Sequence, residues 1–113
     1  MEPETRFNLE SIVVENNDSA HRFQVEIDGQ WAFLEYQLSG SRLVLVHTEV
    51  PTAISKRGLA GKIVRTSLEF ARSRNLTVIP YCPFVVAYIR KHKEYIDLVA
   101  SSFRDKVLSD TDK

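Results

Sequence analysis

The first half of the chain is a series of short apolar or alternating polar and apolar runs, with the two-residue period typical of strands. The pair Asp28-Gly29 separates two of these runs and is typical of a type I′ hairpin turn, because both central positions of that turn require a positive φ. The last run is almost wholly apolar at its centre, which favours a strand covered on both faces. The pattern therefore predicts an antiparallel meander of about four strands, which we expect at Ser11–Glu15, Arg22–Ile27, Gln30–Leu38 and Arg42–Val50.

After Pro51 the apolar residues recur at the spacing of an amphipathic helix of roughly sixteen residues, which we expect to end near Asn75. A short apolar strand follows at Leu76–Tyr81, and a helix between two buried strands predicts a right-handed crossover that makes those strands parallel. Proline is favoured at the first position of a helix, so a C-terminal helix is expected from Pro83. The rest of the chain predicts a further helical turn at Glu94–Val99 and a polar tail from Arg104 that frays.

Length and composition place these elements in a single α+β or α/β domain over residues 1–113, with a core at about 8–100 and flexible residues before it and after 103. The chain is 43% apolar and 27% charged, and it has no apolar run of the roughly 18 to 20 residues that span a bilayer. Met1–Arg6 does not resemble a signal peptide. The only cysteine, Cys82, excludes an intramolecular disulfide and a zinc site built from several cysteines. We therefore expect a cytoplasmic protein without a metal site or a membrane partner.

The charges cancel over the whole chain, with 15 basic and 15 acidic residues, but they are unevenly distributed. Residues 1–55 hold three basic and nine acidic side chains, whereas residues 56–113 hold twelve basic and six acidic ones. A net charge of zero argues against a dedicated nucleic-acid binder, because phosphate contacts require a basic excess. The basic second half is where a small anionic ligand would bind, although solvated faces of opposite sign explain the same counts.

A glycine-containing turn lies just before the predicted long helix and is the first candidate for chemistry. Glycine and alanine let the backbone approach a ligand, the helix start presents free N–H groups, and three cations add positive charge, so the turn suits a pyrophosphate. The spacing is not that of a P-loop. The alternative is a glycine used for helix packing beside solvated cations. The candidate cofactor-binding residues of this turn are Lys56, Arg57, Gly58, Leu59, Ala60, Gly61 and Lys62.

Cys82 ends a predicted strand and precedes Pro83, which places it at the start of a helix. The positive end of the helix dipole favours the thiolate form, so this position suits a reactive cysteine, while the alternative is an inert buried thiol. His47 and Glu49 end the neighbouring parallel strand, and the ends of parallel strands share one edge of the sheet. We therefore expect both residues near Cys82, either as a general base or, for His47, as a structural histidine.

A basic cluster at Arg90–Lys93 lies beside Tyr88 and Tyr95. Cations interleaved with aromatic residues bind nucleic acid in some proteins, but this cluster is short and the acidic first half offsets it. A solvated helix end is one interpretation, and binding of a nucleotide phosphate by Tyr88, Arg90 and Lys91 is the other.

Five blocks in this order resemble the small GNAT-like N-acetyltransferase family of single-domain proteins. They are His47–Pro51, Arg57–Ala60, Ile79–Val85, Tyr88–His92 and Glu94-Tyr95. The resemblance covers roughly residues 20–100 and implies a trimmed acetyl-CoA-binding fold, with a cofactor cleft where two parallel strands splay apart. It implies that backbone amides around Gly58 and Ala60 hold the CoA pyrophosphate and that Cys82 lies near the thioester. Ser55 departs from the Gln or Arg that is usual at its position, which puts one side-chain contact in doubt.

The first hypothesis is thus an acetyl-CoA-dependent N-acetyltransferase that acts on the amine of a small molecule or a protein, directly or through acetyl-Cys82. The alternative is a non-catalytic module that binds CoA or acyl-CoA, because so short a chain leaves little room for an acceptor pocket. A nucleic-acid binder is a third and weaker reading. We expect a monomer or a weak dimer.

Overall fold

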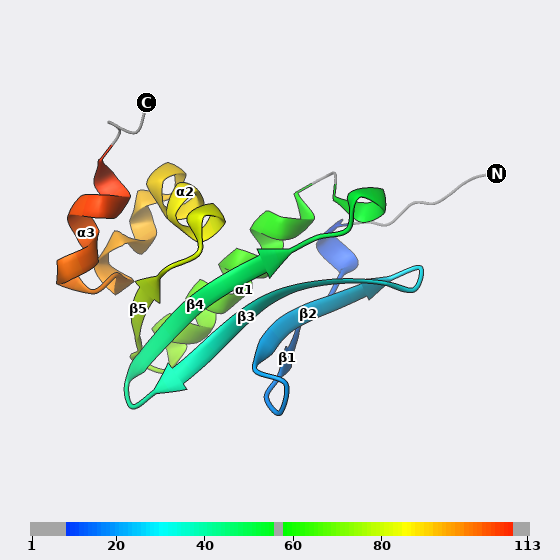
Figure 1. Cartoon of the computed structure of the whole chain (residues 1–113), viewed down its shortest axis with the longest axis horizontal. Coiled ribbons are helices and arrows are strands. Elements are labelled where there is room, and N and C mark those ends of the chain that lie inside the picture. The colour runs from blue at the N-terminus through cyan, green and yellow to red at the C-terminus, as the bar shows by residue number, and fades with distance from the viewer. Residues whose placement is uncertain (1–8, 56–57, 110–113) are drawn as a thin grey trace.

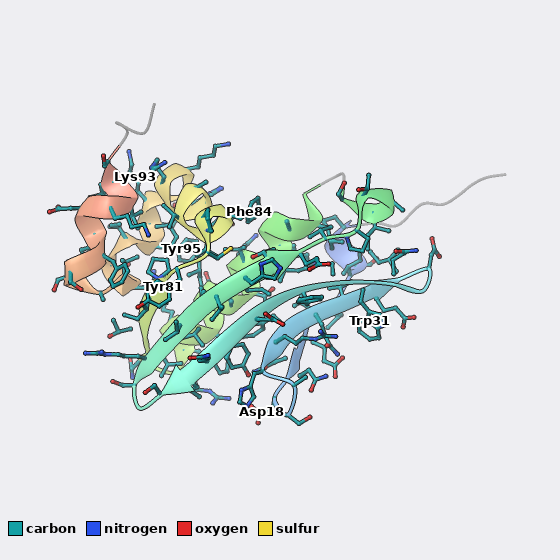
Figure 2. The ribbon with its side chains drawn as sticks, in the orientation of Figure 1. Asp18, Trp31, Tyr81, Phe84, Lys93 and Tyr95 are labelled. Carbon is teal, nitrogen blue, oxygen red and sulfur yellow. The ribbon has the colours of Figure 1, made fainter. Side chains whose placement is uncertain are left out.

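Five strands form one mixed sheet in the computed structural model, which describes residues 9–55 and 58–109 (Figure 1). The strands follow one another across the sheet in chain order. The first four are antiparallel to their neighbours, and the fifth is parallel to the fourth, as predicted. The strands are β1 Glu15–Asn17, β2 Arg22–Ile27, β3 Gln30–Ser39, β4 Arg42–Glu49 and β5 Thr77–Pro80.

Three α-helices and three short 3₁₀ helices complete the described chain. The long helix between β4 and β5 and the helix that begins at Pro83 were both predicted, and their bounds agree closely with the prediction. The α-helices are α1 Leu59–Ser73, α2 Pro83–Lys91 and α3 Ser101–Leu108, and the 3₁₀ helices are η1 Leu9–Ser11, η2 Thr52–Ile54 and η3 Lys93–Leu98.

The hairpin between β2 and β3 has the turn that its sequence indicates. Asp28 and Gly29 both have positive φ values, of 53° and 78°. The flanking residues Ile27 and Gln30 are paired across the turn. The prediction of a type I′ turn is confirmed by these angles.

The first strand lies later in the chain than predicted. Ser11–Glu15 was expected to be a strand, but Leu9–Ser11 is a 3₁₀ helix and β1 begins only at Glu15. Two asparagines favour the later position through their side chains: Asn16 accepts a hydrogen bond from the Tyr36 hydroxyl at 2.7 Å, and Asn17 accepts one from the backbone N–H of Ala20 at 3.1 Å. Asn16 and Asn17, which follow the strand that the sequence predicted, therefore belong to β1 itself.

Helix α1 packs against one face of β2, β3 and β4, and none of the described helices covers the other face of these strands; in Figure 1, α1 runs behind the β4 side of the sheet. Leu34 and Leu45 from the sheet and Ile63 from α1 are fully buried in one core. On the opposite face, Val46 is 36% exposed. The prediction that β4 is covered on both faces is wrong, because α2 and α3 pack at the β5 end of the sheet and not over this face of β4 (Figure 1).

A bulge in β4 changes which of its residues face the core. Tyr36 of β3 pairs with Leu45, and Glu35 pairs with His47, so Val46 is an extra residue. Regular alternation from Leu45 would point His47 into the core, since side chains alternate along a strand. The extra residue reverses that alternation, so Thr48 faces the α1 side.

The C-terminal segment is helical, where the sequence predicted a fraying tail. Val107 in α3 is fully buried. Arg90 of α2 donates a hydrogen bond from Nε to the carbonyl of Val107 at 2.7 Å, and Arg104 donates from Nε to the carbonyl of Val99 at 2.9 Å. Arg90 from α2 thus satisfies a carbonyl at the end of α3, which local polarity could not indicate, and Arg104 of α3 itself satisfies a carbonyl just before the helix.

Candidate functional site: a gap between two parallel strands

Strands β4 and β5 separate from each other after a short parallel ladder. The last paired residues are Leu45 and Pro80. The backbone N–H groups of Tyr81 and Cys82 both donate to the carbonyl of Leu45, each at 3.0 Å, and there the chain leaves the sheet and enters α2. Strand β4 continues to Glu49, so its last four residues have no partner in β5 (Figure 1). This is the splayed arrangement that the resemblance implied.

Cys82 lies at the closed end of this gap, at the N-cap position of α2, as the sequence predicted. Its side chain is 3% exposed and makes no capping hydrogen bond to the amides of α2. Its Sγ atom lies 3.2 Å from Oγ1 of Thr48 on β4. The thiol is therefore oriented toward the strand rather than toward the helix that it begins.

His47 and Glu49 flank Thr48 but point to the opposite face of the strand. Nε2 of His47 lies 3.2 Å from Oε1 of Glu49, and the two side chains are 55% and 62% exposed. The imidazole also packs edge-on against Phe33 at 6.4 Å between ring centroids. Both residues lie on β4 beyond its last pairing with β5, but the sequence did not predict that the bulge turns their side chains onto the open face of the sheet, so that Thr48 contacts Cys82 instead.

The start of α1 has the predicted glycine, in a conformation that favours glycine. Gly58 is the N-cap residue, with a φ of 81°, and as a glycine it has no side chain that could cap the helix amides. Leu59 is buried in the core and Ala60 is half-buried. Lys56 and Arg57 lie outside the described residues. The Nζ of Lys62 donates to the carbonyl of Leu9 at 2.6 Å, so the segment before β1 already holds this ammonium group.

A cavity of 630 Å³ extends from this helix start along α1 to the end of α2. Tyr88 of α2 and His92, the C-cap residue of α2, form one wall, with their rings stacked at 4.2 Å between centroids. A Cβ on Gly61 would lie 3.4 Å from the Tyr88 ring. Burial raises the pKa of the Tyr88 hydroxyl, and the nearby Arg65 opposes that effect. We call this cavity the α1–α2 groove; its lining residues are Leu9, Gly58, Gly61, Lys62, Arg65, Thr66, Glu69, Tyr88 and His92.

The sequence missed several residues of this groove. Arg65, Thr66 and Glu69 follow Gly58, Gly61 and Lys62 at helical spacing, and that periodicity was the signal that could have identified them. The basic cluster at the end of α2 is divided by the fold. Tyr88 and His92 line the groove, whereas Arg90 donates to carbonyls of α3 and the side chain of Lys91 is exposed.

Residues 9–55 and 58–109 contain neither a cluster of metal ligands nor a helix that could span a membrane. Within that part of the chain, no three His, Cys, Asp or Glu side chains are grouped so that they could hold a metal ion. None of the helices described there is long and apolar enough to cross a bilayer.

The meander, the parallel β5 and the gap beside a glycine-capped helix define a trimmed GNAT-like domain. The chain belongs to the GCN5-related N-acetyltransferase family, whose sequence model matches residues 22–98. It is similar to Protein NATD1 of Gallus gallus and of Homo sapiens, with 32% identity to each over 84 residues; these cover 72% of this chain and 76% and 74% of the two relatives. Protein NATD1 of Danio rerio is 25% identical over 91 residues, which cover 76% of this chain and 83% of that protein.

Proposed function

We propose that the protein is an acetyl-CoA-dependent N-acetyltransferase that transfers an acetyl group to an amine. The observation that carries this proposal is the gap between β4 and β5, with Cys82 at its closed end. The last four residues of β4 have no β5 partner, so their outward backbone groups are available to an extended ligand. The pantetheine arm of CoA is extended and carries amide groups, and it therefore suits such an edge.

The nucleotide end of acetyl-CoA then lies at the start of α1 and along the α1–α2 groove. The free amides after Gly58, at Leu59, Ala60 and Gly61, suit the pyrophosphate because they lie at the positive end of the helix dipole. Lys56, Arg57 and Lys62 would add positive charge at that point. The stacked rings of Tyr88 and His92 offer a surface on which a base can stack. Arg90 and Lys91 would act only through their long-range positive charge.

Two chemical routes fit the residues at the gap. In the direct route, the His47–Glu49 pair takes a proton from the ammonium form of the acceptor. The amine nitrogen then attacks the thioester carbon, the carbon–sulfur bond to CoA breaks, and the second proton that the nitrogen loses passes to the departing CoA thiolate. In the covalent route, the Cys82 thiolate attacks first, and the CoA thiolate that leaves takes up the proton that Cys82 released. The amine then attacks the acetyl-Cys82 carbon, and its proton passes to Sγ as that bond breaks.

A thermal unfolding experiment with CoA, acetyl-CoA and AMP tests the proposal. A ligand at about 100 times its Kd stabilises the native state by roughly 2.7 kcal/mol, so CoA and acetyl-CoA should raise the Tm clearly while AMP has a much smaller effect. No shift at millimolar CoA would overturn the proposal. Acetylation of an amine panel, followed by mass spectrometry, then tests transfer itself.

A non-catalytic acyl-CoA-binding module is the second candidate, and the near-complete burial of Cys82 favours it. This candidate predicts the same Tm shift without amine-dependent consumption of acetyl-CoA. Under either function we propose a cytoplasmic protein, since its single free thiol suits a reducing compartment, and a monomer or weak dimer, which size-exclusion chromatography tests.

A further inference from the structure

The hydroxyl group of Thr48 is the polar side-chain group that the described structure places against Sγ of Cys82, at 3.2 Å. The two residues are 34 positions apart in sequence, so no local motif pairs them. Thr48 reaches Cys82 only because the bulge at Val46 turns it toward the α1 side of β4. The contact therefore depends on the bulge in β4, which lies where β4 and β5 separate.

Cys82 has an alternative partner nearby that it does not use. As the N-cap residue of α2 it could accept from the first amides of that helix, yet its side chain makes no such hydrogen bond. Pro83 at the first helical position carries no N–H, which removes one of those donors. The first turn of α2 contains no charged side chain, and the titratable residues beside Thr48 on β4, His47 and Glu49, point to the open face. The hydroxyl of Thr48 is thus the side-chain group of the described residues at hydrogen-bond distance from the sulfur, and it can donate to the sulfur.

We propose that Thr48 is a positioning residue for Cys82: its hydroxyl donates a hydrogen bond to the thiolate and holds Sγ toward the gap. A hydrogen bond to a charged acceptor is stronger than one between neutral groups, so this contact favours the thiolate over the thiol. The consequence for catalysis rests on the proposed function, in its covalent route. The effect on the thiol itself does not depend on CoA.

The test is the ionisation of Cys82, which is the only cysteine of the chain, so alkylation and blank-corrected thiolate absorbance report on this thiol alone. Thr48→Val keeps the shape of the side chain and removes the hydroxyl, and Thr48→Ser keeps the hydroxyl. Cys82→Ser supplies the blank that subtracts tyrosine absorbance. We expect Thr48→Val to lower the thiolate fraction at mildly alkaline pH about tenfold, and Thr48→Ser to stay within about threefold of the parent.

Circular dichroism and the Tm check that each variant is folded, and Thr48→Ala replaces Thr48→Val if the valine disrupts the core. The proposal is overturned if removal of the hydroxyl leaves ionisation unchanged, if Thr48→Ser lowers it equally, or if His47→Gln lowers it more than Thr48→Val.

A separate measurement of CoA binding keeps the two proposals distinguishable. Thr48→Val should retain the Tm shift with CoA, and it should lower kcat for acetyl transfer more than it raises KM. If the parent protein binds no CoA, the proposed function is overturned. The role of Thr48 is then still judged by the ionisation of Cys82 in the Thr48 variants. If CoA binds but removal of the Thr48 hydroxyl leaves the ionisation of Cys82 unchanged, only the proposed role of Thr48 is overturned.

Discussion

Consecutive residues at the end of β4 act on opposite faces of the sheet. Thr48 contacts the buried sulfur of Cys82, while His47 and Glu49 contact each other on the exposed face. A base on the open face can take a proton from an amine that arrives from solvent, whereas the sulfur is shielded from solvent. The roles proposed for His47 and Glu49 in activating the acceptor and for Thr48 in orienting the thiol should therefore be separable by mutation.

Replacement of Glu49 by Gln tests the first of these roles. We expect kcat for amine acetylation near neutral pH to fall about 100-fold, because the pair loses its carboxylate, while the Tm shift with CoA is retained. Glu26→Gln is the matched control, since this carboxylate is also exposed but lies on β2. Turnover that is equal in Glu49→Gln and the parent would exclude the carboxylate as part of the base.

Tyr95 provides a second prediction at the residue scale. Burial and a 2.6 Å hydrogen bond to Glu69 raise the pKa of the Tyr95 hydroxyl from 10.0 to about 12. A raised pKa means that the folded state favours the neutral form, so this contribution to stability is present below pH 10 and is lost as the pH rises toward about 12.

The urea midpoint of the parent should therefore fall between about pH 10 and pH 12, and Tyr95→Phe should show a smaller fall over this range. Urea titrations at several pH values, with circular dichroism as the probe, measure both. Parallel pH profiles for the two proteins would contradict the assignment to Tyr95.

At the scale of elements, the bulge in β4 lies where β4 and β5 separate. A bulge bends its strand and increases the local twist, which allows the end of β4 to leave β5. Helix α1 contributes in a different way, because its start offers free amides and its exposed stripe forms one side of the α1–α2 groove. The proposed cofactor site is thus built from an irregular strand and a regular helix.

Deletion of Val46 tests the importance of the bulge. The deletion keeps Thr48 on the core face but restores regular pairing between β3 and β4, so we expect a straighter β4, a narrower gap and loss of the Tm shift with CoA. Val46→Thr is the control, because it keeps the extra residue and a β-branched side chain. A deletion variant that folds and still responds fully to CoA would rule out a role for the bulge in binding.

At the scale of the whole molecule, a net charge of zero is the sum of two differently charged halves. The acidic first half contains β1 to β4, including the open face with Glu49, and the basic second half contains α1, α2 and α3. A small polyanion such as CoA is expected to bind on the basic part, and a cationic amine is expected to approach the acidic sheet.

Charge reversal at Lys56 and Arg57 tests this division. The double variant to Glu should weaken CoA binding at least about tenfold, because two charge-assisted contacts become repulsive. Isothermal titration at low and high salt measures the effect, which should shrink as salt screens it. Lys106→Glu, an exposed lysine on α3, is the control, and equal losses in both variants would indicate a nonspecific charge effect.

Much of the fold could be predicted because its signals are local. The Asp28-Gly29 turn, the apolar stripe of α1 and Pro83 at the start of α2 each act through the conformation of neighbouring residues. The helix over Ser101–Leu108 could not be predicted, because Val107 is buried by distant elements and Arg90 comes from α2.

The candidate site divides in the same way. The sequence by itself determined that a glycine precedes α1, that Cys82 follows β5 at the start of a helix and that β4 ends beside it, because chain order and the crossover rule set these positions. Only the tertiary structure decided which side chain meets the sulfur. The pairing of β3 with β4 requires one extra residue, Val46, and that residue turns Thr48 toward Cys82 and sends His47 and Glu49 to the open face.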